Sequence, residues 1–185
     1  GNNLIIISLL KKEIKILDLI KNWGIVYIGN LFGSIFYAYL IYISKIYTYN
    51  SFSWGIKAIT IAYNKVNLNF IDGFSKGILC NILVCLAVLI AIGSKSYVSK
   101  IFSIYFPIMA FVASGFEHSV ANMYFIPMGI FLKSDKNLIN LINFDISNLN
   151  FLNFLIKNLI PVTLGNIFGG AILIGILYYL AYLKE

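Results

Sequence analysis

The sequence predicts an all-α membrane protein, organised as an inverted-repeat helical bundle with broken helices in a single domain over residues 1–185. Three observations support this fold class: the composition, the spacing of apolar segments, and an internal repeat. Apolar residues make up 60% of the chain and charged residues 11%, and the mean hydropathy is +0.87. Soluble domains are about 45–50% apolar and about 25% charged, so the composition favours a lipid environment.

The apolar segments have the lengths that membrane helices require. A spanning helix needs about 20 mainly apolar residues. Residues 1–14 are too short and are interpreted as a half-helix and a turn, ending at the charged run Lys11-Lys12-Glu13. Residues 47–68 are interpreted as a polar and aromatic surface connection, and residues 133–150 as a polar, Asn-rich loop. The predicted transmembrane helices are residues 16–46, 69–92, 97–132 (broken at 114–118) and 151–182.

The charge pattern fits a protein in contact with a lipid bilayer and excludes a nucleic-acid partner. The net charge is +7, and it comes from lysines that lie mostly between the apolar segments. A nucleic-acid surface would gather basic residues, with arginines among them, on one face. By the positive-inside rule we assign one set of lysines to the cytoplasmic side: Lys11, Lys12, Lys15, Lys21, Lys95, Lys100 and Lys184. The opposite side receives Lys45, Lys57, Lys65, Lys133, Lys136 and Lys157.

An internal repeat relates two parts of the chain. Residues 22–34 read NWGIVYIGNLFGS and residues 158–170 read NLIPVTLGNIFGG, and each copy contains a G-x-x-x-G that favours close helix packing in lipid. Under the assigned orientation the two repeated helices run in opposite directions, which is typical of inverted repeats with a substrate site near the membrane midplane. The symmetry predicts that one helix and a half-helix belong upstream of Gly1, so we expect the chain to be a fragment.

His118 is the only histidine and the leading candidate for a functional residue. It lies in the run Gly115-Phe116-Glu117-His118-Ser119, in the middle of an apolar segment. An ionisable residue at membrane depth costs about 2.5 kcal/mol or more and usually marks a pathway for ions or substrate. A broken helix is tolerated only where protein buries it or where it lines a cavity. Its position at the break therefore disfavours a structural core histidine.

No cofactor, metal site or enzymatic activity is predicted. Cys80 and Cys85 are five residues apart on one helix, which suits neither a metal pair nor a disulfide, so both are interpreted as small buried hydrophobic residues. The chain has no H-E-x-x-H, no second histidine and no G-x-S-x-G.

The runs ASGFEHSVANMYFIPMG, NLIPVTLGNIFGG and KNWGIVYIGNLFG, with the amino-terminal GNN, resemble the formate/nitrite transporter family. The resemblance implies an aquaporin-like shape, six spans with both termini in the cytoplasm, a homopentamer with one pore in each protomer, and passage of small monovalent anions. IPMG and NLIPVT are more similar to formate channels than to nitrite channels. It also implies a multi-pass protein of the plasma membrane, here the bacterial inner membrane.

The resemblance gives roles to individual residues. His118 matches the central pore histidine, Asn81 and Asn166 match two pore asparagines, and Lys65 matches a lysine near the outer mouth. Phe111 matches an aromatic at the outer constriction, and Val84 lies one turn from Asn81 and would narrow the inner side. Without the resemblance, the asparagines would be interhelical hydrogen-bonding residues and Lys65 a solvated lysine.

Several alternatives stay open at this point. The anion could be nitrite or hydrosulfide, and transport could be passive or linked to protons, because His118 titrates near pH 6.5 unless its environment changes. Glu117 points away from His118 on a regular backbone, and we expect it to bond loop N–H groups or a neighbouring helix. The family's threonine precedes the Gly-Asn with which this chain begins, so a non-conducting structural membrane fragment is the other alternative.

Overall fold

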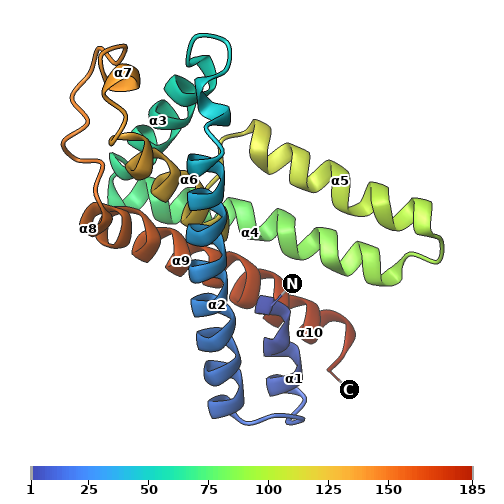
Figure 1. Ribbon diagram of the computed structural model, residues 1–185. Coiled ribbons are helices and arrows are strands. Elements are labelled where there is room, and N and C mark those ends of the chain that lie inside the picture. The colour runs from blue at the N-terminus through green and yellow to red at the C-terminus, as the bar shows by residue number, and fades with distance from the viewer. Residues whose placement is uncertain (1, 185) are drawn as a thin grey trace. The chain divides into compact units, whose positions relative to one another are not determined.

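The computed structural model describes residues 2–184, and its secondary structure is helical (Figure 1). The chain divides into two compact units. The first unit contains residues 2–26, 71–118 and 162–184, and the second unit contains residues 27–70 and 119–161. Gly1 and Glu185, which the predicted domain 1–185 includes, lie outside the described residues. Within the described chain, the helices long and apolar enough to cross a membrane are α2 (Ile16–Ile43), α4 (Phe70–Gly93) and the continuous helix Phe151–Tyr182.

The first unit begins with two short helical pieces, η1 (Asn2–Ile5) and α1 (Ile6–Leu10). Both pack against η4 (Phe168–Ile176), which belongs to the last long helix. α1 stops at a turn in which Lys12 adopts a left-handed backbone with φ of 60°. The predicted half-helix at the start of the chain is therefore a short helix that packs on η4 within the same unit.

The last long helix alternates between α and π geometry. It is built from α8 (Phe151–Asn153), η3 (Phe154–Leu159), α9 (Ile160–Ile167), η4 and α10 (Leu177–Tyr182), with η3 and η4 π-helical. Pro161 follows η3 closely, and proline removes an N–H and clashes with the carbonyl four residues earlier. The wider turn moves that carbonyl away, and the Ile160 N–H donates to the Leu155 oxygen.

The predicted span 97–132 is two helices, α5 (Tyr97–Ala113) and α6 (Ser119–Leu132), separated by residues 114–118. The N–H of Gly115 donates to the Val112 oxygen at 3.1 Å, and the N–H of Phe116 donates to the Phe111 oxygen at 3.0 Å. This pair of bonds is a Schellman motif, which needs a left-handed residue after the helix. Gly115 supplies it with φ of +66°, so this glycine ends α5.

In the second unit, α3 (Ser53–Val66) packs against α6. Residues 47–68 are therefore more than the surface connection that the sequence predicts. One face of α3 is buried through Gly55, Ile59, Ala62 and Val66. At the contact, a Cβ on Gly129 would collide with the Cβ of Ala62. This buried face was not predicted because polar and aromatic residues lie between its apolar residues in the sequence. The helix is amphipathic and not uniformly apolar.

The connections of the second unit are held by specific polar contacts. α2 ends at Ile43, three residues before its predicted limit, and η2 (Ile46–Thr48) follows a left-handed Lys45. The Tyr47 hydroxyl donates to an Asp135 carboxylate oxygen at 3.0 Å. Burial and this bond raise the pKa of Tyr47 to about 12. The predicted loop 133–150 contains the short helix α7 (Lys136–Ile139).

The two copies of the repeated G-x-x-x-G differ in what they contact. A Cβ on Gly165 would collide with the Phe74 carbonyl oxygen, and a Cβ on Gly169 would collide with that of Ile78. The second copy therefore lets α9 and η4 touch the α4 backbone. At Gly29 and Gly33 of the first copy, a Cβ would meet nothing within 4 Å. The close-packing face predicted for them makes no contact inside their unit.

We predict that Gly165→Ala destabilises the protein by about 1–3 kcal/mol, the usual cost of overpacking, because the rigid backbone at Phe74 cannot move aside. Gly24→Ala is the matched control: it also lies in a helix, but a Cβ there meets nothing within 4 Å. Thermal unfolding in detergent should show a lower midpoint for Gly165→Ala and an unchanged or higher one for Gly24→Ala. Equal midpoints for the two variants would contradict the backbone contact.

Candidate functional site

Asn166 joins the helix break to two helices of the first unit. Its side-chain Nδ2 donates to the carbonyl oxygen of Gly77 in α4 and to that of Glu117 in the break, each at 2.9 Å. Its own carbonyl oxygen accepts the Asn81 Nδ2 at 2.7 Å and the Asn3 Nδ2 at 2.8 Å. Asn166 is buried, with 4% of its surface exposed. One residue therefore connects η1, α4, the break and α9.

The two predicted pore asparagines are in direct contact. Asn81 lies on the buried face of α4, close to the contact that Gly77 makes with α9. A Cβ on Gly77 would stand 2.8 Å from the Val162 oxygen, so only glycine lets the helices approach this closely. This approach brings the Asn81 amide within reach of the Asn166 carbonyl. The bond is an interhelical one, the role that asparagines usually have in membranes.

His118 closes the break and is half-buried. Its ring stacks with that of Phe111, with centroids 6.1 Å apart and planes 30° apart. Phe111 is on the last turn of α5. The Schellman motif then changes the direction of the chain between Phe111 and His118. The structure thus brings together the predicted central histidine and the predicted constriction aromatic.

Glu117 is fixed through its backbone. Its N–H donates to the Lys76 carbonyl oxygen of α4 at 3.3 Å, and its own carbonyl accepts the Asn166 amide. Only 4% of the residue is exposed. The backbone of Glu117 therefore anchors the break to α4 and α9, which places the neighbouring His118.

The other predicted residues of the first unit lie around these contacts. Val84 is half-buried on α4, one turn after Asn81. Phe116 is half-buried and Gly115 is exposed within the turn. Cys80 and Cys85 are buried free thiols. Among the described residues, no three His, Cys, Asp or Glu side chains gather in a way that could hold a metal ion.

Lys65 and Ser119 belong to the second unit. Lys65 is half-buried in the last turn of α3, and its Nζ lies 5.7 Å from the centroid of the Phe125 ring. An ammonium at this distance is attracted by the negative face of the ring. Ser119 is buried at the first position of α6. A small cavity of about 110 Å³ also involves Phe125, with Lys57 and Trp54 from α3 in its wall.

Two asparagines that the sequence analysis did not single out support Lys65. The Asn158 Nδ2 donates to the Lys65 carbonyl oxygen at 2.9 Å, and the Asn158 Oδ1 accepts the Asn122 Nδ2 at 2.7 Å. Both asparagines are completely buried. Asn3 is a third residue that was missed. The available signal was an amide side chain in an apolar segment, whereas Asn81 and Asn166 were singled out by the family resemblance.

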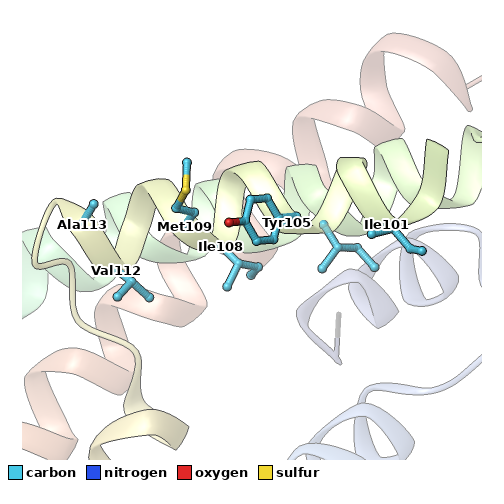
Figure 2. Close-up of a pocket in the computed structure, with 7 residues that line it drawn as sticks. Ile101, Tyr105, Ile108, Met109, Val112 and Ala113 are labelled. Atoms are coloured by element: carbon cyan, nitrogen blue, oxygen red, sulfur yellow. The ribbon is translucent and has the colours of Figure 1, made fainter. Parts of the chain in front are cut away.

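An apolar hollow of the first unit lies along α5, and none of the predicted site residues lines it (Figure 2). It is an open groove of about 650 Å³. Ile101, Ile108, Met109 and Val112 line it, with Tyr105 as the one residue bearing a polar group at its tip. An apolar surface of this kind suits acyl chains or another helix and not a small anion.

Comparison with known proteins relates the chain to one family. The family model described as "Formate/nitrite transporter" matches residues 1–180. The "Formate channel FocA" of Escherichia coli (strain K12) is 41% identical over 173 residues, which cover 91% of this chain and 61% of the relative. A "Probable formate transporter" of Methanothermobacter thermautotrophicus is 41% identical over 194 residues, which cover 97% of this chain and 65% of the relative. The chain therefore spans less than two thirds of the length of these curated relatives.

Solved structures agree with this relationship. A structure described as "Pentameric formate channel with formate bound" is similar with a TM-score of 0.83 and 40% identity, over 90% of this chain and 68% of that one. A second structure, described as "FNT family ion channel", has a TM-score of 0.78 and 28% identity, over 97% of this chain and 67% of that one. These likenesses confirm the predicted all-α membrane fold with broken helices.

We predict that Asn166→Leu lowers the free energy of unfolding by about 1–3 kcal/mol, because the buried Gly77 and Glu117 carbonyls lose a donor. The control is Asn67→Ala, at an exposed amide that bonds the Tyr63 carbonyl at the end of α3, where we expect a change within about 0.5 kcal/mol. Thermal unfolding measures both, and proteolysis within residues 114–118 reports whether the break has loosened. If the Asn166→Leu variant resisted proteolysis within residues 114–118 as well as the unmodified protein does, Asn166 would not be the anchor of the break.

Proposed function

Because this chain belongs to the formate/nitrite transporter family, we propose that the protein carrying it transports small monovalent anions, principally formate, across a membrane. Family membership confirms the resemblance seen in the sequence, and it makes the protein a multi-pass membrane protein of a transporter family and not an enzyme. The single observation that carries the proposal is His118, held at a helix break by the Asn166 contact with Glu117. Formate is favoured over nitrite and hydrosulfide because the similar relatives are named as formate channels or transporters.

The proposed chemistry begins with attraction of the anion. In this proposal Lys65 raises the local anion concentration at the outer mouth, since a fixed positive charge concentrates counter-ions. The Phe125 ring and the Asn158 bond hold the side chain and backbone of Lys65 in one position. A fixed ammonium attracts an anion more effectively than one on a freely moving side chain, because less conformational freedom is lost on contact.

His118 then governs passage through the apolar region. Its imidazole can donate a hydrogen bond to a carboxylate or transfer a proton to it, since histidine titrates near working pH. Formic acid is neutral, so it passes the apolar constriction at Phe111, beside His118, at a lower desolvation cost than the bare anion. Asn81 and Asn166 line the pathway in this proposal, and Val84 narrows its inner side. Whether transport is passive or proton-linked then depends on whether His118 completes a proton transfer.

We further propose that the complete protein is a homopentamer with a pore in each protomer, in a bacterial inner membrane. The support is the similar solved channel, whose description is pentameric, and the bacterial relatives. Uptake of formate, nitrite, hydrosulfide and lactate into liposomes, measured side by side, tests the substrate. Fastest uptake of formate is the expected result. A faster flux of nitrite or hydrosulfide would change the substrate, and no flux for any anion would favour a structural membrane protein.

We predict that His118→Phe abolishes the switch of formate transport with pH, because the variant keeps an aromatic ring beside Phe111 but cannot bind a proton. The measurement is formate flux into proteoliposomes between pH 5 and 8, the range in which histidine titrates. If the variant kept the pH profile of the unmodified protein, the proton-transfer role would be wrong.

We predict that Lys65→Gln reduces formate uptake severalfold at low salt and much less at about 0.5 M salt, because salt screens the attraction of the lysine. Lys57→Gln, on the same helix, is the matched control with the same charge change. A loss for Lys65→Gln that did not depend on salt would mean that the residue acts through packing. Equal, salt-dependent losses for both variants would assign the attraction to the general charge of α3.

A further inference from the structure

Contacts with α9, α2 and η4 surround Asn3 and its neighbour Asn2. Its Nδ2 donates to the Asn166 carbonyl oxygen at 2.8 Å. The Trp23 indole N–H donates to the carbonyl of the neighbouring Asn2 at 3.2 Å, which ties η1 to α2. A Cβ on Gly170 would stand 2.6 Å from the Asn3 Nδ2, so the amide fits only because this residue of η4 is glycine. The position of Asn3 is therefore set by its surroundings.

Asn3 and Asn81 share one acceptor. Both side-chain amides donate to the Asn166 carbonyl, where a helix carbonyl usually accepts one backbone N–H. The shared carbonyl lies two residues before the helix widens into η4. A hydrogen bond is electrostatically stronger in a low-dielectric interior than in water. Two donors on the carbonyl of Asn166 therefore fix the residue whose side chain holds the break.

The bonds form a path from Asn3 to the histidine. Asn3 and Asn81 hold the Asn166 backbone, the Asn166 side chain holds the Glu117 carbonyl, and Glu117 directly precedes His118. Each bond lies within the first unit. We propose that Asn3 is a positioning residue of the transport site, which acts with Asn81 through Asn166 to set the place of the His118 ring. This inference rests on the proposed function, because the pH response of transport reports on that ring.

The ionisable groups around the break limit what else could change the pH response. Glu117 lies in the break itself, and α5 carries Lys100, Tyr97 and Tyr105. Asp72, Lys76 and the thiols Cys80 and Cys85 lie on α4. η1, α1, α9 and η4 carry no ionisable side chain. An effect of Asn3 on the pH profile therefore has to pass through the hydrogen-bond path and not through a charge on its own element.

The test compares Asn3→Leu with Asn2→Leu in formate flux into proteoliposomes across pH. Leucine removes the amide at either position, but the contact that Asn2 makes with Trp23 uses its backbone carbonyl and survives. We expect Asn3→Leu to shift the midpoint of the pH profile by about half a unit or more, and Asn2→Leu to leave it unchanged. A profile for Asn3→Leu that coincides with that of the unmodified protein, or equal shifts for both variants, would overturn the inference.

Two further variants keep the test decisive. If Asn3→Leu fails to fold, Asn3→Ala removes the N–H donor without adding bulk or charge, so the same shift is expected. In the His118→Phe background, Asn3→Leu should cause no further change of the pH profile, and a further change would overturn the inference. If His118→Phe itself keeps the unmodified profile, the proposed role of His118 fails first, which separates the two failures.

A double-mutant cycle checks the shared acceptor without any transport measurement. We expect thermal unfolding of the Asn3→Leu and Asn81→Leu double variant to show a larger loss in midpoint than the sum of the single losses. Each single variant removes one of these two amide donors from the Asn166 carbonyl, whereas the double variant removes both. Additive losses would overturn the shared contact.

Discussion

The hydrogen bonds of Asn166 are the interaction on which the first unit depends. The residue gives its side-chain N–H groups to carbonyls of α4 and of the break, and receives amides from Asn3 and Asn81 on its own carbonyl. Residues 114–118 leave the helix, so their backbone groups lose the partners that a continuous helix provides. In lipid no water replaces those partners, and a break persists only where protein supplies them.

Amides suit this task better than charged groups. An asparagine donates and accepts without carrying a charge, so it satisfies carbonyls at membrane depth without the cost of an ion. Glycine makes the short distances possible, because Gly77, Gly165 and Gly169 let α4 touch α9 and η4 backbone to backbone. The asparagine bonds and the glycine contacts are thus parts of one arrangement: the glycines bring the helices together, and the amides then reach across.

The second unit uses the same combination around a different residue. Gly129 lets α6 approach α3 at Ala62, and the buried pair Asn122 and Asn158 holds the carbonyl of Lys65. The result is a lysine fixed at the end of a helix, above an aromatic ring. In both units a neutral amide from another helix holds a backbone carbonyl: that of Lys65 itself in the second unit, and that of Glu117, the residue before His118, in the first.

The sequence alone determined the membrane class, the apolar helices, the break at Gly115 and the identity of the family, because each depends on local composition, on the backbone freedom of glycine or on contiguous motifs. The buried face of α3 was not predicted, since its apolar residues are interleaved with polar and aromatic ones. The π turns of the last helix and the roles of Asn3, Asn122 and Asn158 were not predicted either. Asn3 and Asn166 are 163 residues apart, and sequence spacing cannot tell which amide meets which carbonyl. Only the tertiary structure decides this, because hydrogen bonds act over about 3 Å, and that proximity is created by helix packing.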